Sequence, residues 1–414
     1  MPRGVGHIHG FSFFNAITFQ IIIGAPLILF AKSLGATSTV LGVMTAFTPL
    51  MTIFQLPAAR FLPVYGYKSL VLAGWGIRTV FIVLMAAIPM ADFLDAPAKL
   101  VLMAGLLLVF NFLRGASSAA WMPWIASLIP EEEKARFLSR DQVFMLCGSL
   151  VALVTSSLVM GGEAVEWEYS LVFGISAAAG GISLWFLRRV PDVAAPEVMR
   201  TSSEPVPWRA MIGHPPFHRL LVFNLLYVLV VGSLGVFTVE YLHELPGFDL
   251  SEVLFLTAVS FCGALILLPP AGRLLDARGC RVVLMLALGM FALVIAGWFC
   301  LSTGLLPGRR RYVAALNFLS GAAGAVFNVA NARVMFATMP AMGRNHFFAL
   351  FTVITSLGLG ASPVTWGVIL DWVGSFEWVT GSLEWHRHSF YFAVLFVLNL
   401  ITLWRAGSLQ DTRL

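Results

Sequence analysis

Charged residues are scarce in this chain of 414 residues, because Asp, Glu, Lys and Arg together make up only 11% of it. Soluble domains hold about 25% charged residues and about 45–50% apolar ones. Here 59% of the residues are hydrophobic, which is more apolar surface than one globular core could hide. The composition therefore excludes an ordinary soluble protein and makes lipid the solvent for much of the chain.

The sequence also lacks the patterns of metal sites and of common catalytic centres. Its four cysteines are scattered and form no CxxC pair, so neither a disulfide framework nor a zinc site is expected. It has no Gly-rich phosphate loop, no G-x-S-x-G and no His–carboxylate arrangement. We therefore expect no cofactor and no enzymatic activity. The net charge of +5 lies in loops between apolar runs and does not indicate a nucleic-acid partner.

What the sequence does contain is a series of long apolar runs, each near the roughly 20 residues that cross a bilayer as a helix. The alternation of apolar and polar residues that is typical of membrane β-barrels is absent. Gly and Pro interrupt the runs, which membrane helices tolerate where neighbouring helices satisfy the freed backbone groups. These features predict an all-α polytopic membrane protein. The twelve predicted spans cover residues 11–31, 38–60, 69–90, 99–127, 142–161, 169–187, 217–240, 252–272, 281–303, 312–337, 346–370 and 389–405.

The distribution of basic residues orients these spans. Of the 26 Lys and Arg residues, seventeen lie in loops, in tails or at span ends on the side of both termini, six lie on the other side and three lie deep within spans. Because basic loops are retained in the cytoplasm, both termini are predicted to be cytoplasmic, in a multi-pass protein of the cell (inner) membrane. The first apolar run is longer than a signal-peptide core and lacks a small-residue cleavage site, so it is predicted to remain as span 1.

A phrase repeats at half the length of the chain. Residues 111–119 read NFLRGASSA, and residues 317–325 read NFLSGAAGA, an offset of 206 residues. Between the halves lies a Pro-rich, charged stretch without apolar periodicity. Each half is therefore predicted to be one copy of a six-span unit. The predicted parts are an N-terminal half (1–190), a cytoplasmic linker (191–216) and a C-terminal half (217–414).

The loop between spans 8 and 9 reads GRLLDARGCR, with Gly272, Asp276, Gly279 and Arg281 at the spacing Gly-x3-Asp-x2-Gly-x-Arg. It resembles the signature loop of the major facilitator superfamily, which this family also carries between spans 2 and 3. The N-terminal counterpart, ARFLPVYGYK, keeps its glycine and lysine but lacks the acid. An acidic residue at one helix end can pair with nearby basic residues and bias one conformation, so the four residues are predicted to form a conformational-switch loop.

The resemblance covers essentially the whole chain and implies the fold and general activity of this family. A secondary transporter of this type works by rocking of two six-span halves about a site near the bilayer midplane. The resemblance further implies that spans 1, 4, 7 and 10 line the central cavity and that the protein acts as a monomer. The expected partners are a small-molecule substrate and the lipid bilayer, with a coupling ion left open.

The ionisable residues deep within the predicted spans are all arginines: Arg78, Arg114 and Arg333. None of the 21 acidic residues lies at the middle of a span. A charge at the bilayer centre costs at least about 2.5 kcal/mol, so each of these arginines is a candidate for a functional role. Arg333 can reach the interface. Arg78, in span 3, is expected to pair with backbone carbonyls outside the cavity. Arg114, near mid-depth in span 4, is the best candidate for binding substrate.

An arginine stays protonated, and its forked donors suit a carboxylate or phosphate. The substrate is therefore predicted to be a small polar or anionic organic solute. The asparagines of the repeated phrase, Asn111 and Asn317, are expected to bridge helices instead, and the Gly and Ala that follow them to allow close packing. The predicted substrate-binding residues are Arg114, Asn15, Gln20, Asn224, Tyr227, Asn328 and Asn331.

Two other functions remain open from the sequence. A proton-coupled multidrug efflux antiporter would need a carboxylate in its cavity, and the nearest candidates are Glu240 and Asp371, at the ends of spans 7 and 11. A non-transporting membrane receptor on a carrier fold would bind its ligand without moving it across the membrane.

Overall fold

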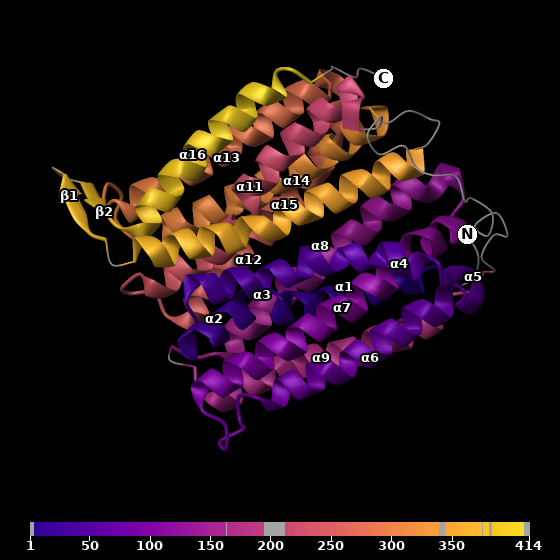
Figure 1. The fold of residues 1–414 in the computed structure, drawn as a ribbon, viewed down its shortest axis with the longest axis horizontal. Helices are drawn as coiled ribbons and strands as arrows, with labels where there is room; N and C mark the ends of the chain where they lie inside the picture. Colours follow the sequence, from indigo (N-terminus) through magenta and orange to yellow (C-terminus); the bar gives the residue numbers. More distant parts are fainter. Residues whose placement is uncertain are drawn as a thin grey trace. The chain divides into compact units, whose positions relative to one another are not determined.

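The computed structural model describes residues 4–162, 164–193, 212–338, 344–374, 376–380 and 383–409. Helices dominate it (Figure 1). The elements in chain order are α1 (His7–Ile22), α2 (Ala25–Ser33), α3 (Ser38–Met51), η1 (Thr52–Phe54), α4 (Gln55–Ala59), α5 (Leu62–Tyr65), α6 (Tyr67–Ala87), α7 (Ala96–Leu128), α8 (Glu131–Val159), α9 (Glu166–Arg188), α11 (Pro215–Glu244), α12 (Leu250–Arg278), α13 (Cys280–Ser302), α14 (Arg310–Thr338), α15 (Arg344–Val373), β1 (Trp378–Thr380), β2 (Leu383–Trp385) and α16 (Arg387–Ala406).

Twelve helical stretches within the described ranges are long and apolar enough to cross a membrane, so the predicted number of spans and the all-α class are confirmed. Two spans are interrupted. Span 1 consists of α1 and α2, which meet at Ile23 and Gly24, and Pro26 is the second residue of α2. Span 2 passes from α3 through the 3₁₀ turn η1 into α4, which contains Pro57. Proline explains both interruptions, because it has no N–H to donate and its ring crowds the preceding turn.

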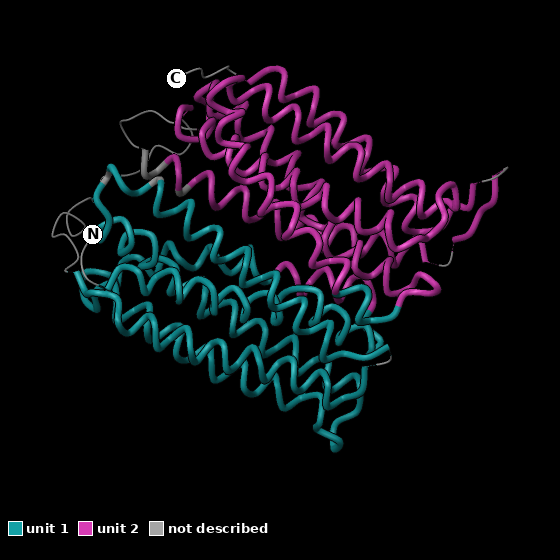
Figure 2. Tube along the Cα trace, turned by 180° about the vertical axis from the view of Figure 1, so that it is seen from behind, with its two compact units in different colours: residues 1–36, 47–205, 249–254 teal, residues 37–46, 206–248, 255–414 magenta. Residues whose placement is uncertain are grey.

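The chain forms two compact units (Figure 2). Unit 1 comprises residues 1–36, 47–205 and 249–254, and unit 2 comprises residues 37–46, 206–248 and 255–414. The first turns of span 2 thus belong to unit 2, and the first turns of span 8 belong to unit 1. Most of the predicted linker, residues 194–211, lies outside the described residues. The division into 1–190, 191–216 and 217–414 therefore stays a prediction.

The glycine of the repeated phrase has the same packing role in both units. A Cβ atom at Gly115 on α7 would lie 1.9 Å from the carbonyl oxygen of Met51, and one at Gly321 on α14 would lie 1.7 Å from that of Ser260 on α12. Real Cβ atoms do not approach a backbone oxygen so closely, so each helix pair meets backbone to backbone. Small residues permit such close crossings in membrane helices. The structure therefore supports the interpretation of this phrase as a packing element.

A short antiparallel ribbon, β1–β2, precedes α16 and was not predicted. Trp378 pairs with Trp385 and Thr380 with Leu383 in its register. The signal in the sequence was weak, since each strand has only three residues. The stretch WVTGSLEW carries β-branched and aromatic residues around a Gly-Ser turn signal, which is typical of a hairpin.

We expect Gly321→Ala to destabilise the protein by about 1–3 kcal/mol, because the added methyl group forces α14 and α12 apart. Gly324→Ala on the same helix is the matched control, since nothing lies within 4 Å of its Cβ position. The control should be neutral or slightly stabilising, because alanine favours helix. Thermal unfolding of the detergent-purified variants measures both effects, and equal midpoints would contradict the packing role.

Candidate functional site

The first candidate site lies in unit 1, where three helices bring two arginines to one aromatic ring. Asn15 and Phe19 lie one turn apart on α1, Trp75 and Arg78 lie nearly one turn apart on α6, and Arg114 lies on α7. Helix α6 packs along α7 within this unit. Residues spaced by three or four positions share one helix face. The pair on α1 and the pair on α6 therefore each lie on a single face of their helix.

Arg78 is buried, with only 1% of its surface exposed. Its Nη2 donates a hydrogen bond to Oδ1 of Asn15, which also accepts from the indole nitrogen of Trp75 at 3.2 Å. The guanidinium carbon lies 4.3 Å from the Trp75 ring centroid, 5.0 Å from that of Phe19 and 5.4 Å from that of Phe110. These contacts differ from the predicted pairing with backbone carbonyls. Aromatic faces attract the cation, but they add no negative charge.

Arg114 approaches the same ring from α7. Its guanidinium carbon lies 5.6 Å from the Phe19 centroid. Its Nη2 donates to the Thr48 carbonyl oxygen and, at 3.3 Å, to the Thr52 hydroxyl. The close crossing at Gly115 makes this contact possible, because it brings the end of α3 against α7. The two guanidinium groups therefore flank one phenyl ring, and their like charges repel each other.

Several donors of this arginine pair have no partner. Nε and Nη1 of Arg78 and Nε of Arg114 are buried without an acceptor among the described residues. No carboxylate of the described part of the chain forms an ion pair with either side chain. Leaving a buried donor unsatisfied costs about 1–3 kcal/mol, and more for a charged group. The site thus has both the charge and the free donors to bind an anion.

In unit 2, two predicted residues bind each other. Nδ2 of Asn331 on α14 donates to Oδ1 of Asn224 on α11 at 2.7 Å. One turn along α11, the Tyr227 ring stacks on Phe327, with centroids 3.5 Å apart. Asn328 is exposed. Among the residues predicted to bind substrate, those of unit 2 therefore form a neutral amide pair and an aromatic stack. The one charged residue of this set, Arg114, lies in unit 1. Gln20, on α1 of unit 1, is half-buried.

The repeated asparagines differ in their contacts. Nδ2 of Asn111 donates to the Leu107 carbonyl of its own helix, while its Oδ1 accepts from the Thr48 hydroxyl at 3.0 Å, so it bridges α7 and α3 as predicted. Asn317 donates to the Val313 carbonyl of its own helix. Asn317 and Ser320 also line a cavity of about 240 Å³ in unit 2. Ser320 occupies the repeat position of Arg114, so one copy carries a charge where the other borders an open space.

Two acidic residues, Asp141 and Glu240, lie inside helices. Asp141, ten residues after the start of α8, accepts from the Ser12 hydroxyl at 2.9 Å and contacts His9 at 3.0 Å. Glu240, four residues before the end of α11, is fully buried. Helix α8 begins before predicted span 5, and α11 continues past the predicted end of span 7. Periodicity could not place these residues, because polar partners from distant helices allow the helices to extend past them.

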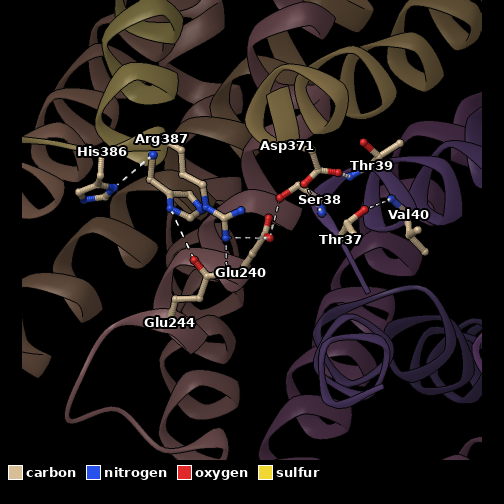
Figure 3. A network of polar contacts seen from close by, with 10 residues as sticks. Thr37, Ser38, Thr39, Val40, Glu240, Glu244, Asp371, His386 and Arg387 are labelled. Carbon is tan, nitrogen blue, oxygen red and sulfur yellow. Dashed lines mark hydrogen bonds and ion pairs between the residues drawn. The ribbon is translucent and has the colours of Figure 1, made fainter. Parts of the chain in front are cut away.

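Glu240 belongs to a polar network at one end of unit 2 (Figure 3). Its Oε1 accepts from the Ser38 hydroxyl at 2.7 Å and lies 3.5 Å from Nη2 of Arg387. Arg387 also pairs with Glu244, one turn farther along α11. On the other side of Ser38, Asp371 accepts backbone N–H groups of α3. The network joins residues that are up to 333 positions apart in the chain.

A pocket of about 800 Å³ opens beside this network and is lined by the β1–β2 ribbon and the ends of α11 and α13. Glu244, His386 and Arg387 border it. Burial is the main reason why the pKa of His386 falls below its usual value, and the adjacent Arg387 acts in the same direction. His386 is therefore neutral at pH 7. Of the residues predicted to bind substrate, all of which the structure describes, none lines this pocket.

The sequence matches the model of the Major Facilitator Superfamily over residues 9–251 and 235–410. The chain belongs to this family. It is therefore a multi-pass membrane protein that works as a secondary transporter and not as an enzyme. No curated protein matches its sequence.

Solved structures of several transporters resemble this family member along nearly their whole length. A mutant of the nucleoside transporter NupG has a TM-score of 0.75 at 11% identity, covering 99% of this chain and 100% of that one. A D-xylose-proton symporter has a TM-score of 0.76 at 15% identity, covering 98% and 96%. A POT family transporter in complex with 5-aminolevulinic acid has a TM-score of 0.71 at 12% identity, covering 99% and 97%. At these identities the likeness shows the fold alone.

The predicted switch loop of this transporter takes a defined shape. Gly279 separates α12 from α13 with φ +81° and ψ 166°, and Gly66 before α6 has nearly the same angles, φ +74° and ψ 168°. Such a positive φ favours glycine. Asp276 pairs with Arg333 of α14 at 2.6 Å, which gives this arginine a partner. Arg281 lies near Gly407, and Gly272 has open space at its Cβ position. The switching role of the loop stays a prediction.

We expect Arg78→Met to raise the thermal midpoint of the ligand-free transporter, equivalent to about 1–3 kcal/mol. The substitution removes a buried charge with two unsatisfied donors and keeps much of the apolar contact. Arg333→Met, which removes a partly exposed ion pair, is the control and should change stability little. A lower midpoint for Arg78→Met would identify a structural arginine that stabilises the helices.

Proposed function

We propose that this transporter carries a small anionic organic solute by alternating access, and that Arg114 contacts the anionic group. The arrangement of Arg78 and Arg114 about Phe19 is the observation that carries this proposal. Both side chains have buried, unsatisfied N–H groups, and no described carboxylate neutralises either of them. An anion would supply the missing acceptors and the missing charge together.

Arginine suits this role for geometric reasons. Its planar group can donate two parallel hydrogen bonds to a carboxylate or phosphate, and such charge-assisted bonds are stronger than neutral ones. Arg114 is less deeply buried than Arg78, which is enclosed. We therefore assign direct contact to Arg114, while Arg78 raises the positive potential of the site from behind the Phe19 ring. A lipophilic cation would be repelled by both charges.

The polar residues of both units provide the remaining hydrogen-bonding groups in this proposal. Asn15 and Gln20 on α1 supply amides in unit 1. In unit 2 the candidates are Asn224, Asn331, Tyr227 and Asn328. The similar structures include a nucleoside transporter, a xylose symporter and a complex with 5-aminolevulinic acid, all of which concern small polar solutes. These names support the polar class.

The proposed setting follows from the basic residues. Seventeen of the 26 Lys and Arg residues lie in loops, in tails or at span ends on the side of both termini, which supports cytoplasmic termini in a cell (inner) membrane. We propose that the functional form is the monomer. A coupled ion is also part of this proposal, since one of the similar structures is a proton symporter.

We expect Arg114→Ala to lower the uptake of anionic solutes by proteoliposomes at least tenfold, because the loss of one charge-assisted contact costs about 1.5–3 kcal/mol. Arg114→Lys should retain part of the uptake, since it keeps the charge but loses the fork. Arg311→Ala removes an exposed arginine and is the control.

The substrate class is first identified by a thermal-shift screen with matched anionic, neutral and lipophilic-cationic solutes, because a ligand of the folded state raises its apparent stability. Stabilisation by anions that disappears in Arg114→Ala supports the proposal. Stabilisation by lipophilic cations in both proteins contradicts it. Binding of anions without uptake would favour a receptor on a carrier fold.

The second candidate function is proton-coupled efflux of drugs, which the burial of Glu240 favours, because a buried carboxylate can carry a proton and attract a cation. On this alternative, Glu240→Gln abolishes proton-driven export of a lipophilic cation, whereas Glu252→Gln, at the start of α12, does not. Dye export from energised vesicles measures this difference. On our main proposal, neither variant exports the dye, and the wild type does not export it either.

A further inference from the structure

The start of α3 has an unusual N-terminal cap. The first N–H groups of a helix lack acceptors within the helix, and the residue at the N-cap usually supplies one. Here the carboxylate of Asp371, on α15, accepts the N–H of Ser38 at 3.0 Å and that of Thr39 at 2.8 Å. The local Thr37 hydroxyl accepts the Val40 N–H at the longer distance of 3.4 Å. The principal cap of α3 therefore comes from a helix more than 300 positions later in the chain.

A second carboxylate holds the same turn of α3. The Ser38 hydroxyl donates to Glu240 at 2.7 Å, so both the backbone and the side chain of Ser38 bind acidic residues of unit 2 (Figure 3). Arg387 lies 3.5 Å from Glu240 and helps to orient this carboxylate. Because the N-terminus of a helix carries about half a positive charge, two carboxylates there stabilise it.

The helices meet closely at this point. A Cβ atom at Gly367 on α15 would lie 2.4 Å from the Ser38 carbonyl oxygen, and one at Gly42 on α3 would lie 2.2 Å from that of Pro363. The capping carboxylate therefore lies one turn from a crossing of two backbones. Separation of α3 from α15 would remove the cap and this packing together.

The start of α12, near the matching position of the repeat, is capped differently. Asp249 directly precedes this helix and accepts the Glu252 N–H at 2.8 Å, so α12 carries its own cap. Its link to α8 is neutral, because Ser157 and Ser251 donate to each other's carbonyl oxygens at 2.8 and 2.7 Å. The charged cap from a remote helix is thus a feature of α3 and not of the repeat as a whole.

We infer that Asp371, with Glu240, is a latch on the start of α3 and sets how readily this turn leaves unit 2 during the transport cycle. Alternating access requires segments of the two sequence halves to part and meet again. A single capping residue changes a helix equilibrium by roughly 2- to 30-fold. Asp371 acts here as a positioning residue, since it need not touch the substrate. The inference rests on transport by this family and not on the proposed anion.

The test is the exposure of a buried reporter on α3. Leu41 is 1% exposed, so Leu41→Cys, made in a protein whose four native cysteines are serines, is protected while the latch is closed. A membrane-impermeant maleimide added to intact cells reports how often it opens. We expect Asp371→Ala to increase the labelling rate about tenfold, and Asp371→Asn to increase it less, because the amide oxygen still accepts one N–H.

Ser38→Ala provides an independent variant, since it removes only the bond to Glu240 and should also speed labelling. Asp249→Ala removes the local cap of α12 and is the matched control, with labelling unchanged. Thermal midpoints close to that of the parent exclude general unfolding as the cause. Labelling at the parent rate in both Asp371→Ala and Ser38→Ala, or an equal increase in Asp249→Ala, would overturn the inference.

Discussion

A positive charge buried among helices must find compensation within the protein, and the site of this transporter depends on where that compensation is missing. Arg333 has Asp276, and Arg387 has two glutamates. Arg78 and Arg114 have aromatic faces, an amide and a carbonyl, none of which carries a full negative charge. In a medium where unpaired charges are costly, this shortage makes anion binding favourable.

The two units use one packing plan with different chemistry. Gly115 and Gly321 allow the same backbone contact, so the geometry of the repeat is kept. The residue before Gly115 is an arginine that binds α3, whereas the one before Gly321 is a serine beside a cavity. The helix starts differ in the same manner, since α3 is capped by a remote carboxylate and α12 by its own. In our proposals, this difference in charge between two similarly packed units provides one place to bind a solute and another to regulate movement.

The membrane setting, the twelve helices and the family could all be predicted from the sequence, because apolar length, the repeat at 206 residues and the Gly-x3-Asp-x2-Gly-x-Arg loop are local patterns. The packing role of NFLxGA was also predictable, since small residues have few other uses in a span. The β1–β2 ribbon was missed because three-residue strands leave almost no periodicity. Predicted span 7 ended at Glu240, because a charged residue lowers the local hydropathy, whereas helix α11 continues to Glu244.

The sequence by itself determined how much of this chain lies in lipid, how many times it crosses, and that arginines are the charges at mid-span. These properties depend on the solvation of single segments. Only the tertiary structure decided which charges are compensated, because a partner for Arg78, Ser38 or Glu240 comes from a helix 63 to 333 positions away. The free energy of a buried charge depends on the groups within a few ångströms, and sequence distance does not specify them.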